Sequence, residues 1–414
     1  MSKLEELIQK LCPNGVEYKA MDELGYFYGG LSGKSRDDFV DGNAKFVTYK
    51  NIYSNLALNL AIDDKVKIDE NENQNTIQYG DVLFTGSSET PDECGFSSVL
   101  TTQTEEKLYL NSFCFGYRFF DKSTFLPDFS KYLFRSQKLR TAIGKTASGV
   151  TRFNVSKKKM GKIKIPIPPI EVQEEIVRIL DKFTELTAEL TAELTARKKQ
   201  YEFYRDNILN FSNCNDVPKH KLTEIFNTRN GYTPSKNNKQ FWNTSEISWF
   251  RMDDIRENGR ILDKAIQGVS ISAVKGKPFP KNSIIVSTSA TIGEHALIKC
   301  ESLANQRFTY LMLKDEYKDK YNIMFLFYYC FVLDEYCKEN LNQGNFASVD
   351  MRKFNEFEFP MPSLEEQNRI VAILDRFDKL CNDISEGLPA EIEARQKQYE
   401  YYRDKLLTFE EIAQ

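Results

Sequence analysis

The sequence predicts an α+β protein in which two mixed α/β domains are separated by two long antiparallel helices that form a coiled coil. The two halves are expected to be a pseudo-twofold internal duplication, because two segments occur almost unchanged a second time. IVRILDKF (176–183) returns as IVAILDRF (370–377) with six of eight positions matched, and QYEFYRD (200–206) returns as QYEYYRD (398–404) with six of seven. A repeat this long exceeds a solenoid unit and indicates that half the chain was duplicated.

The repeats divide the 414 residues into four parts, which is consistent with more than one domain. We predict a first α/β domain over 1–165 and a central helical spacer over 166–211. A second α/β domain is predicted over 212–359, and a C-terminal helical spacer over 360–414.

Each spacer has the pattern of a long amphipathic helix. Apolar residues recur every three or four positions from Ile176 to Phe211 and again from Ile370 to Phe409, apart from one step of seven in each, with charged residues on the other faces. This stripe includes Tyr201, Tyr204, Tyr399 and Tyr402, which we interpret as core residues rather than as a base-stacking platform.

Proline-rich stretches, PIPPIEVQ and PMPSLEEQ, end the preceding strand and start each helix. Gly387 and Pro389 are expected to break the second helix. One such helix cannot bury its stripe alone, so we expect the two to pair as an antiparallel coiled coil that brings the two termini together. The alternative is that each helix packs on its own domain. The acidic outer faces are predicted to be free to meet partner proteins: Glu171, Glu174, Glu175, Glu365 and Glu366.

The duplication extends weakly into the α/β domains. The strand pattern DVLFT (81–85) aligns with SIIVS (283–287), and MDEL (21–24) aligns with LTEI (222–225). The domains have therefore diverged much further than the helices, as expected of two copies with a similar scaffold and different targets.

Composition limits the class of protein. No run of eighteen apolar residues occurs and the eight cysteines are scattered without a CxxC pair, so we expect a cytoplasmic protein without a membrane partner, a zinc site or disulfides. The net charge is −4, yet residues 131–164 hold eleven Lys and Arg and no acid. Such a block is typical of a phosphate-binding surface. The alternative is a solvated basic face.

The chain resembles the DNA specificity subunit of type I restriction-modification systems. The resemblance is carried by the paired PxPxxExQ…IV.ILD.F segments, by GYTPS (231–235) and by the repeat TELTAELTAELTA (184–196). The first domain departs from the GxTPS pattern and has YGGLSGKSR (28–36) at that place.

The resemblance implies a function and partners. Two target-recognition domains would each read one half of an asymmetric bipartite sequence in double-stranded DNA. The helical spacer would set the gap between the half-sites and dock modification subunits, expected to be two, and motor-nuclease restriction subunits would join them. S-adenosylmethionine is expected on the modification subunit and no cofactor in this chain.

No catalytic or metal-binding residues are predicted. GGLSGKS (29–35) lacks the first glycine of a phosphate-binding loop, because Tyr28 occupies that position. Neither GxGxxG, HExxH nor the Asn-Pro-Pro-aromatic segment of adenine methyltransferases occurs. A self-contained restriction or methylation enzyme and a coiled-coil scaffold that binds only proteins remain as alternatives.

DNA contacts are predicted for loop and basic residues, because phosphates are bound by Lys and Arg and base edges by polar side chains. Phosphate contacts are expected from Lys138, Arg140, Lys145, Arg152, Lys157, Lys158 and Lys159. Base reading in the first domain is assigned to Lys34, Ser35, Arg36, Tyr49, Lys50, Ser87, Ser88 and Arg152. Base reading in the second domain is assigned to Thr233, Ser235, Lys236, Arg251, Ser289, Thr291, Gln306, Arg307, Gln343 and Asn345.

Overall fold

The structure is a computed structural model that describes residues 3–212, 214, 216–342, 347–382 and 387–412. It divides into two compact units, one formed by residues 1–189 with 393–414 and the other by residues 190–392. Each unit therefore contains one α/β domain and a stretch of each helical spacer. No described helix is long and apolar enough to cross a membrane.

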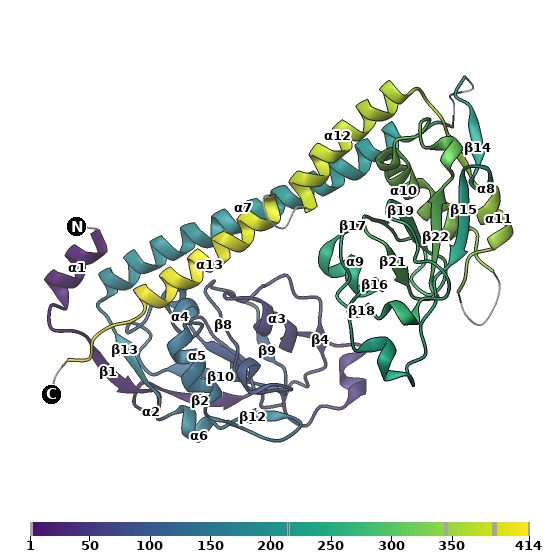
Figure 1. Ribbon diagram of the computed structural model, residues 1–414. Helices are drawn as coiled ribbons and strands as arrows, with labels where there is room; N and C mark the ends of the chain where they lie inside the picture. Colours follow the sequence, from purple (N-terminus) through teal and green to yellow (C-terminus); the bar gives the residue numbers. More distant parts are fainter. Residues whose placement is uncertain (1–2, 213, 215, 343–346, 383–386, 413–414) are drawn as a thin grey trace. The chain divides into compact units, whose positions relative to one another are not determined.

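The first unit is built on a four-stranded antiparallel sheet of order β2-β10-β6-β8, beside a second sheet of order β4-β3-β9-β5 (Figure 1). Two small sheets, β1-β13 and β11-β12-β7, complete it. Its strands are β1 (Glu17–Ala20), β2 (Gly25–Gly29), β3 (Ala44–Val47), β4 (Lys65–Val66), β5 (Thr76–Ile77), β6 (Val82–Thr85), β7 (Ser87–Ser88), β8 (Ser97–Val99), β9 (Leu108–Leu110), β10 (Cys114–Phe119), β11 (Ala147–Ser148), β12 (Phe153–Val155) and β13 (Lys164–Ile167). Its helices are α1 (Lys3–Leu11), α2 (Met21–Leu24), α3 (Tyr49–Ser54), α4 (Pro127–Leu133), α5 (Gln137–Gly144) and α6 (Lys157–Met160).

The second unit repeats this plan with a five-stranded sheet of order β15-β22-β19-β20-β17 and a three-stranded sheet of order β18-β16-β21. A two-stranded sheet, β14-β23, corresponds to β1-β13. Its strands are β14 (Lys219–Lys221), β15 (Phe226–Asn230), β16 (Ile247–Phe250), β17 (Ile261–Leu262), β18 (Gly268–Val269), β19 (Ser283–Ser287), β20 (His295–Ile298), β21 (Ser302–Ala304), β22 (Phe308–Leu313) and β23 (Glu358–Pro360). Its helices are α8 (Leu222–Ile225), α9 (Met252–Asn258), α10 (Ile323–Glu339) and α11 (Met351–Glu356).

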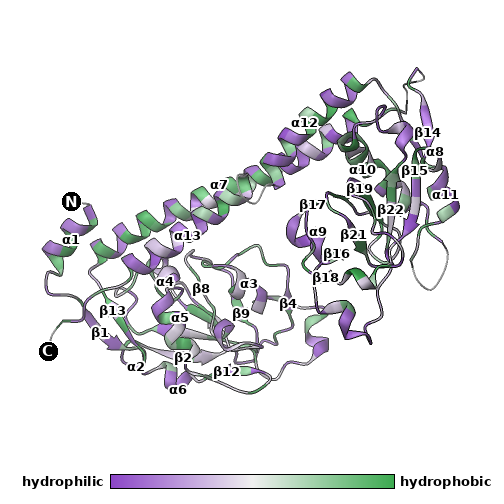
Figure 2. Cartoon of the chain, viewed as in Figure 1, coloured by the Kyte–Doolittle hydropathy of each residue, from purple (hydrophilic) through white to green (hydrophobic). Residues whose placement is uncertain are grey.

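Three long helices form the spacers: α7 (Ile170–Ile208), α12 (Leu364–Asn382) and α13 (Leu388–Leu406). Helix α7 carries hydrophobic and hydrophilic bands along its length (Figure 2). The predicted break in the second spacer is confirmed, since α12 ends at Asn382 and α13 begins at Leu388 with Pro389 in its first turn. The missing backbone N–H of proline is tolerated at that position of a helix.

The long helices pair within each unit. In the second unit the ring of Tyr201 on α7 lies 6.3 Å from that of Phe377 on α12, and Tyr204 also stacks on Phe377 at 5.8 Å. In the first unit Phe183 of α7 stacks on Tyr402 of α13 at 5.3 Å, and α13 runs back along the first half of α7 (Figure 1). Tyr201 and Tyr399 are 5% and 6% exposed, which confirms that both are core residues, and Tyr402 is half-buried. Tyr204 is 41% exposed, so its interpretation as a core residue is wrong: its ring stacks on Phe377, but part of the side chain is open to solvent.

Each unit therefore combines the first segment of one repeat with the second segment of the other. Residues 176–183 and 398–404 both belong to the first unit, whereas 370–377 and 200–206 both belong to the second. The predicted fold class, two mixed α/β domains with paired long helices and an internal duplication, is confirmed.

The proline-rich starts of the helices fix them to their domains through one glutamine each. Gln173 is fully buried, its Nε2 donates to the carbonyls of Thr124 and Pro168, and its Oε1 accepts from the Leu126 N–H. Gln367 is also fully buried and makes the same three contacts in the second unit, with Lys320, Pro362 and Asn322. The Gln of the PxPxxExQ pattern is thus a structural anchor.

An aspartate anchors each helix about two turns further along. The hydroxyl of Tyr132 donates to Asp181 Oδ1 at 2.6 Å in the first unit, and Tyr328 donates to Asp375 Oδ1 at 2.6 Å in the second. Both aspartates belong to the repeated ILD segment. The two segments are alike because each makes the same contact with the tyrosine of its own α/β domain.

The two ends of the chain meet in the first unit, as predicted. The Val16 N–H donates to the Glu410 carbonyl at 2.8 Å, and the Ile412 N–H donates to the Val16 carbonyl at 3.1 Å.

Two further expectations about the helical faces are wrong. Glu175 is 3% exposed, and its carboxylate pairs with Arg178 and with Lys3, which together lower its pKa to about 2, so it is not free to meet a partner. Leu186 is 48% exposed although it belongs to the predicted stripe. A leucine every four residues advances about 40° beyond a full turn at each step, so the TAEL leucines move away from one face.

Candidate nucleic-acid interface

Three connections of the first unit meet beside the end of β6. The Gly86 N–H donates to the Phe113 carbonyl in the β9–β10 turn at 2.9 Å, and the Val155 N–H donates to the Gly86 carbonyl at 3.0 Å. The hydroxyl of Tyr49, the first residue of α3, donates to the Ser87 carbonyl at 2.9 Å. These three hydrogen bonds hold together the tips of loops that are far apart in sequence.

A hollow of about 640 Å³ lies between these tips. Five residues predicted to read bases line it together: Tyr49, Lys50, Ser87, Ser88 and Arg152. The structure adds residues that the sequence did not indicate: Tyr53, Glu89, Glu93, Phe113 and Thr151. The hollow thus combines cationic, acidic and aromatic groups at one surface.

The loop 34–36 does not line this hollow. The Lys34 ammonium pairs with Glu72 and its side chain is 8% exposed, so a contact with a base would require that ion pair to break. The Ser35 hydroxyl and N–H both bond to Asp38, which lowers the pKa of that carboxyl. Arg36 is exposed at the start of the 3₁₀ turn Arg36–Phe39.

The basic stretch 131–164 separates into internal and exposed cations. Arg135 and Arg140 donate to backbone carbonyls and stack over the Phe96 ring at 4.4 and 4.2 Å, and burial lowers the pKa of each to about 10. The N–H groups of the Arg140 guanidinium are therefore hydrogen-bonded to the loop 92–95 and are not available to bind a phosphate. The exposed lysines of the stretch include Lys138, Lys145, Lys157, Lys158 and Lys159.

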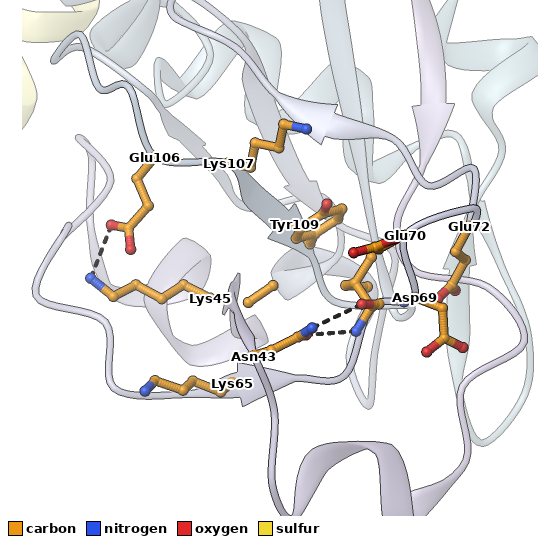
Figure 3. Close-up of a pocket in the computed structure, with 11 residues that line it drawn as sticks. Asn43, Lys45, Lys65, Asp69, Glu70, Glu72, Glu106, Lys107 and Tyr109 are labelled. Carbon is orange, nitrogen blue, oxygen red and sulfur yellow. Dashed lines mark hydrogen bonds and ion pairs between the residues drawn. The ribbon is translucent and has the colours of Figure 1, made fainter.

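A second hollow of the first unit, about 500 Å³, lies along strands β3, β4 and β9 (Figure 3). Lysines 45, 65 and 107 face four carboxylates there, and Lys45 Nζ pairs with Glu106 at 2.9 Å. Its positive charge is already matched, so it is a poorer phosphate site than the exposed lysines.

The second unit carries the GYTPS loop at an equivalent place. Gly231 lies so close to the β21–β22 turn that a Cβ atom would come within 2.4 Å of the Ala304 carbonyl oxygen. Gly30 has the same relation to the β9–β10 turn, where a Cβ would approach the Asn111 carbonyl oxygen to 2.1 Å. The segment starting at Gly30 therefore takes the place of GYTPS in the first domain, as predicted from YGGLSGKSR.

Predicted residues of the second domain also come together. Thr233 donates to Gln306 Oε1 at 2.6 Å, and this joins the GYTPS loop to the β21–β22 turn. Lys236 and Arg251 line a hollow of about 400 Å³ with Lys239, Trp242, Asn243, Trp249 and Gln267. The Arg251 guanidinium lies 5.7 Å from the Trp249 ring centre.

The remaining predicted positions lie on neighbouring loops. Ser235 and Arg307 are exposed, whereas Ser289 and Thr291 are half-buried after β19. Gln343 and Asn345 fall outside the described residues. No group of three His, Cys, Asp or Glu side chains that could hold a metal occurs in the described part of the chain.

The β9–β10 turn (111–113) and the β21–β22 turn (305–307) have the same hydrogen bonds but carry different side chains at the third position. The Asn111 side chain accepts from the Phe113 N–H, and the Asn305 side chain accepts from the Arg307 N–H, both at 2.9 Å. The Thr288 N–H donates to the Arg307 carbonyl as Gly86 does to Phe113. Phe113 and Arg307 thus occupy the same position of one scaffold. In the sequence alone, Phe113 could not be told from a core residue.

Comparison with known proteins gives a family. The family model for the type I restriction modification DNA specificity domain matches residues 13–197 and again residues 215–394. The EcoprrI specificity subunit of Escherichia coli is 57% identical over 198 residues, which cover 46% of this chain and 49% of that protein. The EcoR124I/EcoR124II subunit of Escherichia coli is 42% identical over 272 residues, or 62% of this chain and 65% of that protein. The chain thus spans about half and about two thirds of the lengths of these two relatives.

Solved structures show the same fold. A chain from a study of complex assembly and conformational transition of the type I R-M system matches with a TM-score of 0.65 at 15% identity, covering 95% of this chain and 98% of that one. The HsdS subunit from Thermoanaerobacter tengcongensis matches with a TM-score of 0.52 at 16% identity, covering 96% and 97%.

Proposed function

Because the chain belongs to the family of type I restriction-modification DNA specificity domains, we propose that it is the DNA-recognition subunit of a type I restriction-modification complex. Each α/β domain reads one half of an asymmetric bipartite site in double-stranded DNA. The helical spacer sets the unread gap between the half-sites.

The observation that carries this proposal is the pair of matched loop scaffolds with different tips. The turns at 111–113 and 305–307 have the same backbone contacts, yet one presents Phe113 and the other Arg307. A constant scaffold with changed tips supports two readers that recognise different sequences, since base identity is read by side chains in the groove.

Phosphate contacts supply affinity rather than sequence. The exposed lysines of 131–164, including Lys145, Lys157 and Lys158, are suited to this role because each can neutralise a phosphate. Of the predicted phosphate contacts we therefore keep the exposed lysines and omit Arg140, whose guanidinium is engaged internally.

The catalytic steps, DNA modification and cleavage, are assigned to partner subunits. The chain itself is proposed to be non-catalytic, with S-adenosylmethionine held by a modification subunit that this chain delivers to its site. Motor-nuclease restriction subunits would complete the complex. We further place the complex in the cytoplasm.

Two equivalent exposed aromatic residues support the docking of two modification subunits. Phe203 is 65% exposed and Tyr401 is 61% exposed, and both are the fourth residue of a QYExYRD segment. Each ring lies against the next one, Phe203 on Tyr204 at 5.6 Å and Tyr401 on Tyr402 at 5.3 Å. Exposed aromatics on a rigid helix are typical interface anchors, and a duplicated anchor suits two copies of one partner.

Replacing Phe203 with Ala should weaken one partner site about 30-fold, since an interface aromatic contributes about 2 kcal/mol, and Tyr401→Ala should weaken the other. The mass of the complex measured by light scattering would fall from two modification subunits to one for each single variant, and to none for the double variant. Phe120→Ala is the matched control, because Phe120 is also 65% exposed but lies outside the repeated helices. Two tightly bound subunits on the double variant would contradict this assignment.

The proposed function is tested by expressing the chain with its modification subunit and sequencing the modified adenines. We expect a motif of two unlike half-sites with a fixed unread gap. A continuous motif, or the same motif when this chain is omitted, would refute the proposal.

A further inference from the structure

Arg152 is held by one edge of its guanidinium. It follows β11 in the turn before β12, and its Nε donates to Ser87 Oγ at 3.1 Å. Its guanidinium carbon lies 5.4 Å from the centre of the Phe113 ring. Among the described residues its two terminal nitrogens have no hydrogen-bond partner, and the side chain is exposed.

Other arginines of this domain are arranged the opposite way. Arg135 Nη2 donates to the carbonyls of Ile52 and Tyr53 and its Nε donates to the Ser97 carbonyl. Both terminal nitrogens of Arg140 donate to backbone carbonyls of the loop 92–95. Arg118 uses Nε and a terminal nitrogen together on the Asp81 carboxylate. These three arginines stabilise the domain, whereas Arg152 is held through Nε and leaves both terminal nitrogens of its guanidinium unpaired within the described part of the chain.

A guanidinium held at Nε keeps the geometry that recognises guanine. Its two terminal nitrogens donate in parallel, which matches the adjacent O6 and N7 acceptors of guanine in the major groove. Adenine presents an amino donor in place of O6 and would oppose one of the two N–H groups.

We propose that Arg152 reads a guanine in the half-site of the first domain, with Ser87 and Phe113 as the positioning residues that orient its guanidinium. This inference rests on the proposed function and adds the identity of one base and the residue that reads it.

The acid in the same hollow favours a base edge over a phosphate. Glu93 accepts hydrogen bonds from Ser88 at 3.0 Å and from Tyr53 at 3.1 Å, and these bonds lower its pKa. The carboxylate is therefore charged at neutral pH and repels phosphate. Lys50, which lines the same hollow, remains available to hold the neighbouring backbone.

The second domain supports the assignment of this surface. Arg307 occupies the position of Phe113 on the equivalent turn, so a guanidinium is present at both read-out surfaces but enters from a different loop. The two domains would then recognise their half-sites with the same loop scaffold but with an arginine on a different loop: Arg152 before β12 in the first domain and Arg307 on the β21–β22 turn in the second.

The test uses the full chain with its modification subunit and a library of random duplexes, from which bound sequences are selected and sequenced. Arg152→Ala should reduce the preference for guanine at one position of one half-site by roughly 10- to 100-fold and leave the other half-site unchanged. Arg152→Lys should show the same loss, because a lysine keeps the charge but lacks the planar fork. Arg307→Ala is the control, expected to alter only the other half-site.

The positioning role has a separate readout. Phe113→Ala should lower the same guanine preference several-fold, whereas Phe113→Tyr should restore it because the ring under the guanidinium is kept. The side chains of Phe113, Arg152 and Arg307 are all exposed. Substitutions at these three positions are therefore expected to leave the melting curve of the protein unchanged. The inference is overturned if Arg152→Ala keeps every guanine preference or weakens all sequences equally. A wild-type chain that selects no split motif would overturn the proposed function, and this inference with it.

Discussion

Deletion of one TAEL unit, residues 187–190, is expected to shorten the unread gap by roughly one or two base pairs while both half-site sequences stay the same. Four helical residues span about 6 Å, and one base pair occupies about 3.4 Å of duplex. The deletion also removes about 400° of helical rotation, only about 40° more than a full turn, so the helical faces stay close to register. An added unit should lengthen the gap by the same amount.

Mapping of modified adenines on the deletion and insertion variants would measure the gap. Thr187→Ala is the matched control, because it changes the repeat sequence and keeps the helix length. An unchanged gap in both length variants would show that the helix does not act as the ruler. Altered half-site sequences would show instead that the deletion disturbs the reading domains.

Replacing Asp81 with Ala is expected to destabilise the first unit by about 3 kcal/mol, because it removes one partner of a buried ion pair. Asp81 is 1% exposed and accepts from Arg118 Nε at 2.8 Å, Arg118 Nη2 at 2.7 Å, Tyr28 OH at 2.7 Å and the Gln78 N–H at 2.7 Å. The Arg118 side chain is 17% exposed, so water recovers only part of the lost interaction.

The two tryptophans of the sequence, Trp242 and Trp249, both belong to the second unit, and this makes the prediction selective. Denaturation followed by circular dichroism should show an earlier transition for Asp81→Ala, while the tryptophan fluorescence transition keeps its midpoint. Ser283→Ala, at the aligned position of the second unit, is the control. It should lower the free energy of unfolding of the second unit by only about 1 kcal/mol, because the Ser283 hydroxyl makes one hydrogen bond, to the Pro280 carbonyl. Unchanged transitions by both probes would refute the role of Asp81.

The sequence was sufficient for the features that depend on local pattern. The repeats around Ile176 and Ile370 have helical periodicity, and their near-identity predicted the internal duplication, which the matching contacts of Gln173 and Gln367 now show in the structure. The aligned strands at 81–85 and 283–287 are β6 and β19 with the predicted correspondence.

Features that depend on distant partners could not be predicted. Lys34 looked like a free loop cation, but Glu72, 38 residues away, pairs with it. Glu175 looked like a solvated acid because nothing local reveals that Lys3 reaches it. Phe113 is an ordinary apolar residue in the sequence, and only the Arg152 guanidinium above its ring marks it as part of the candidate site.

The assignment of residues 393–414 to the first unit has a consequence for biosynthesis. During translation, residues 190–392 leave the ribosome as one uninterrupted stretch, so the second unit can fold as it emerges. The part of the first unit's core that Tyr399 and Leu407 cover stays exposed until Tyr399 arrives beside Tyr132 and Glu410 beside Val16. We expect the half that is made first to mature last, which makes it the half most dependent on chaperones in the cell.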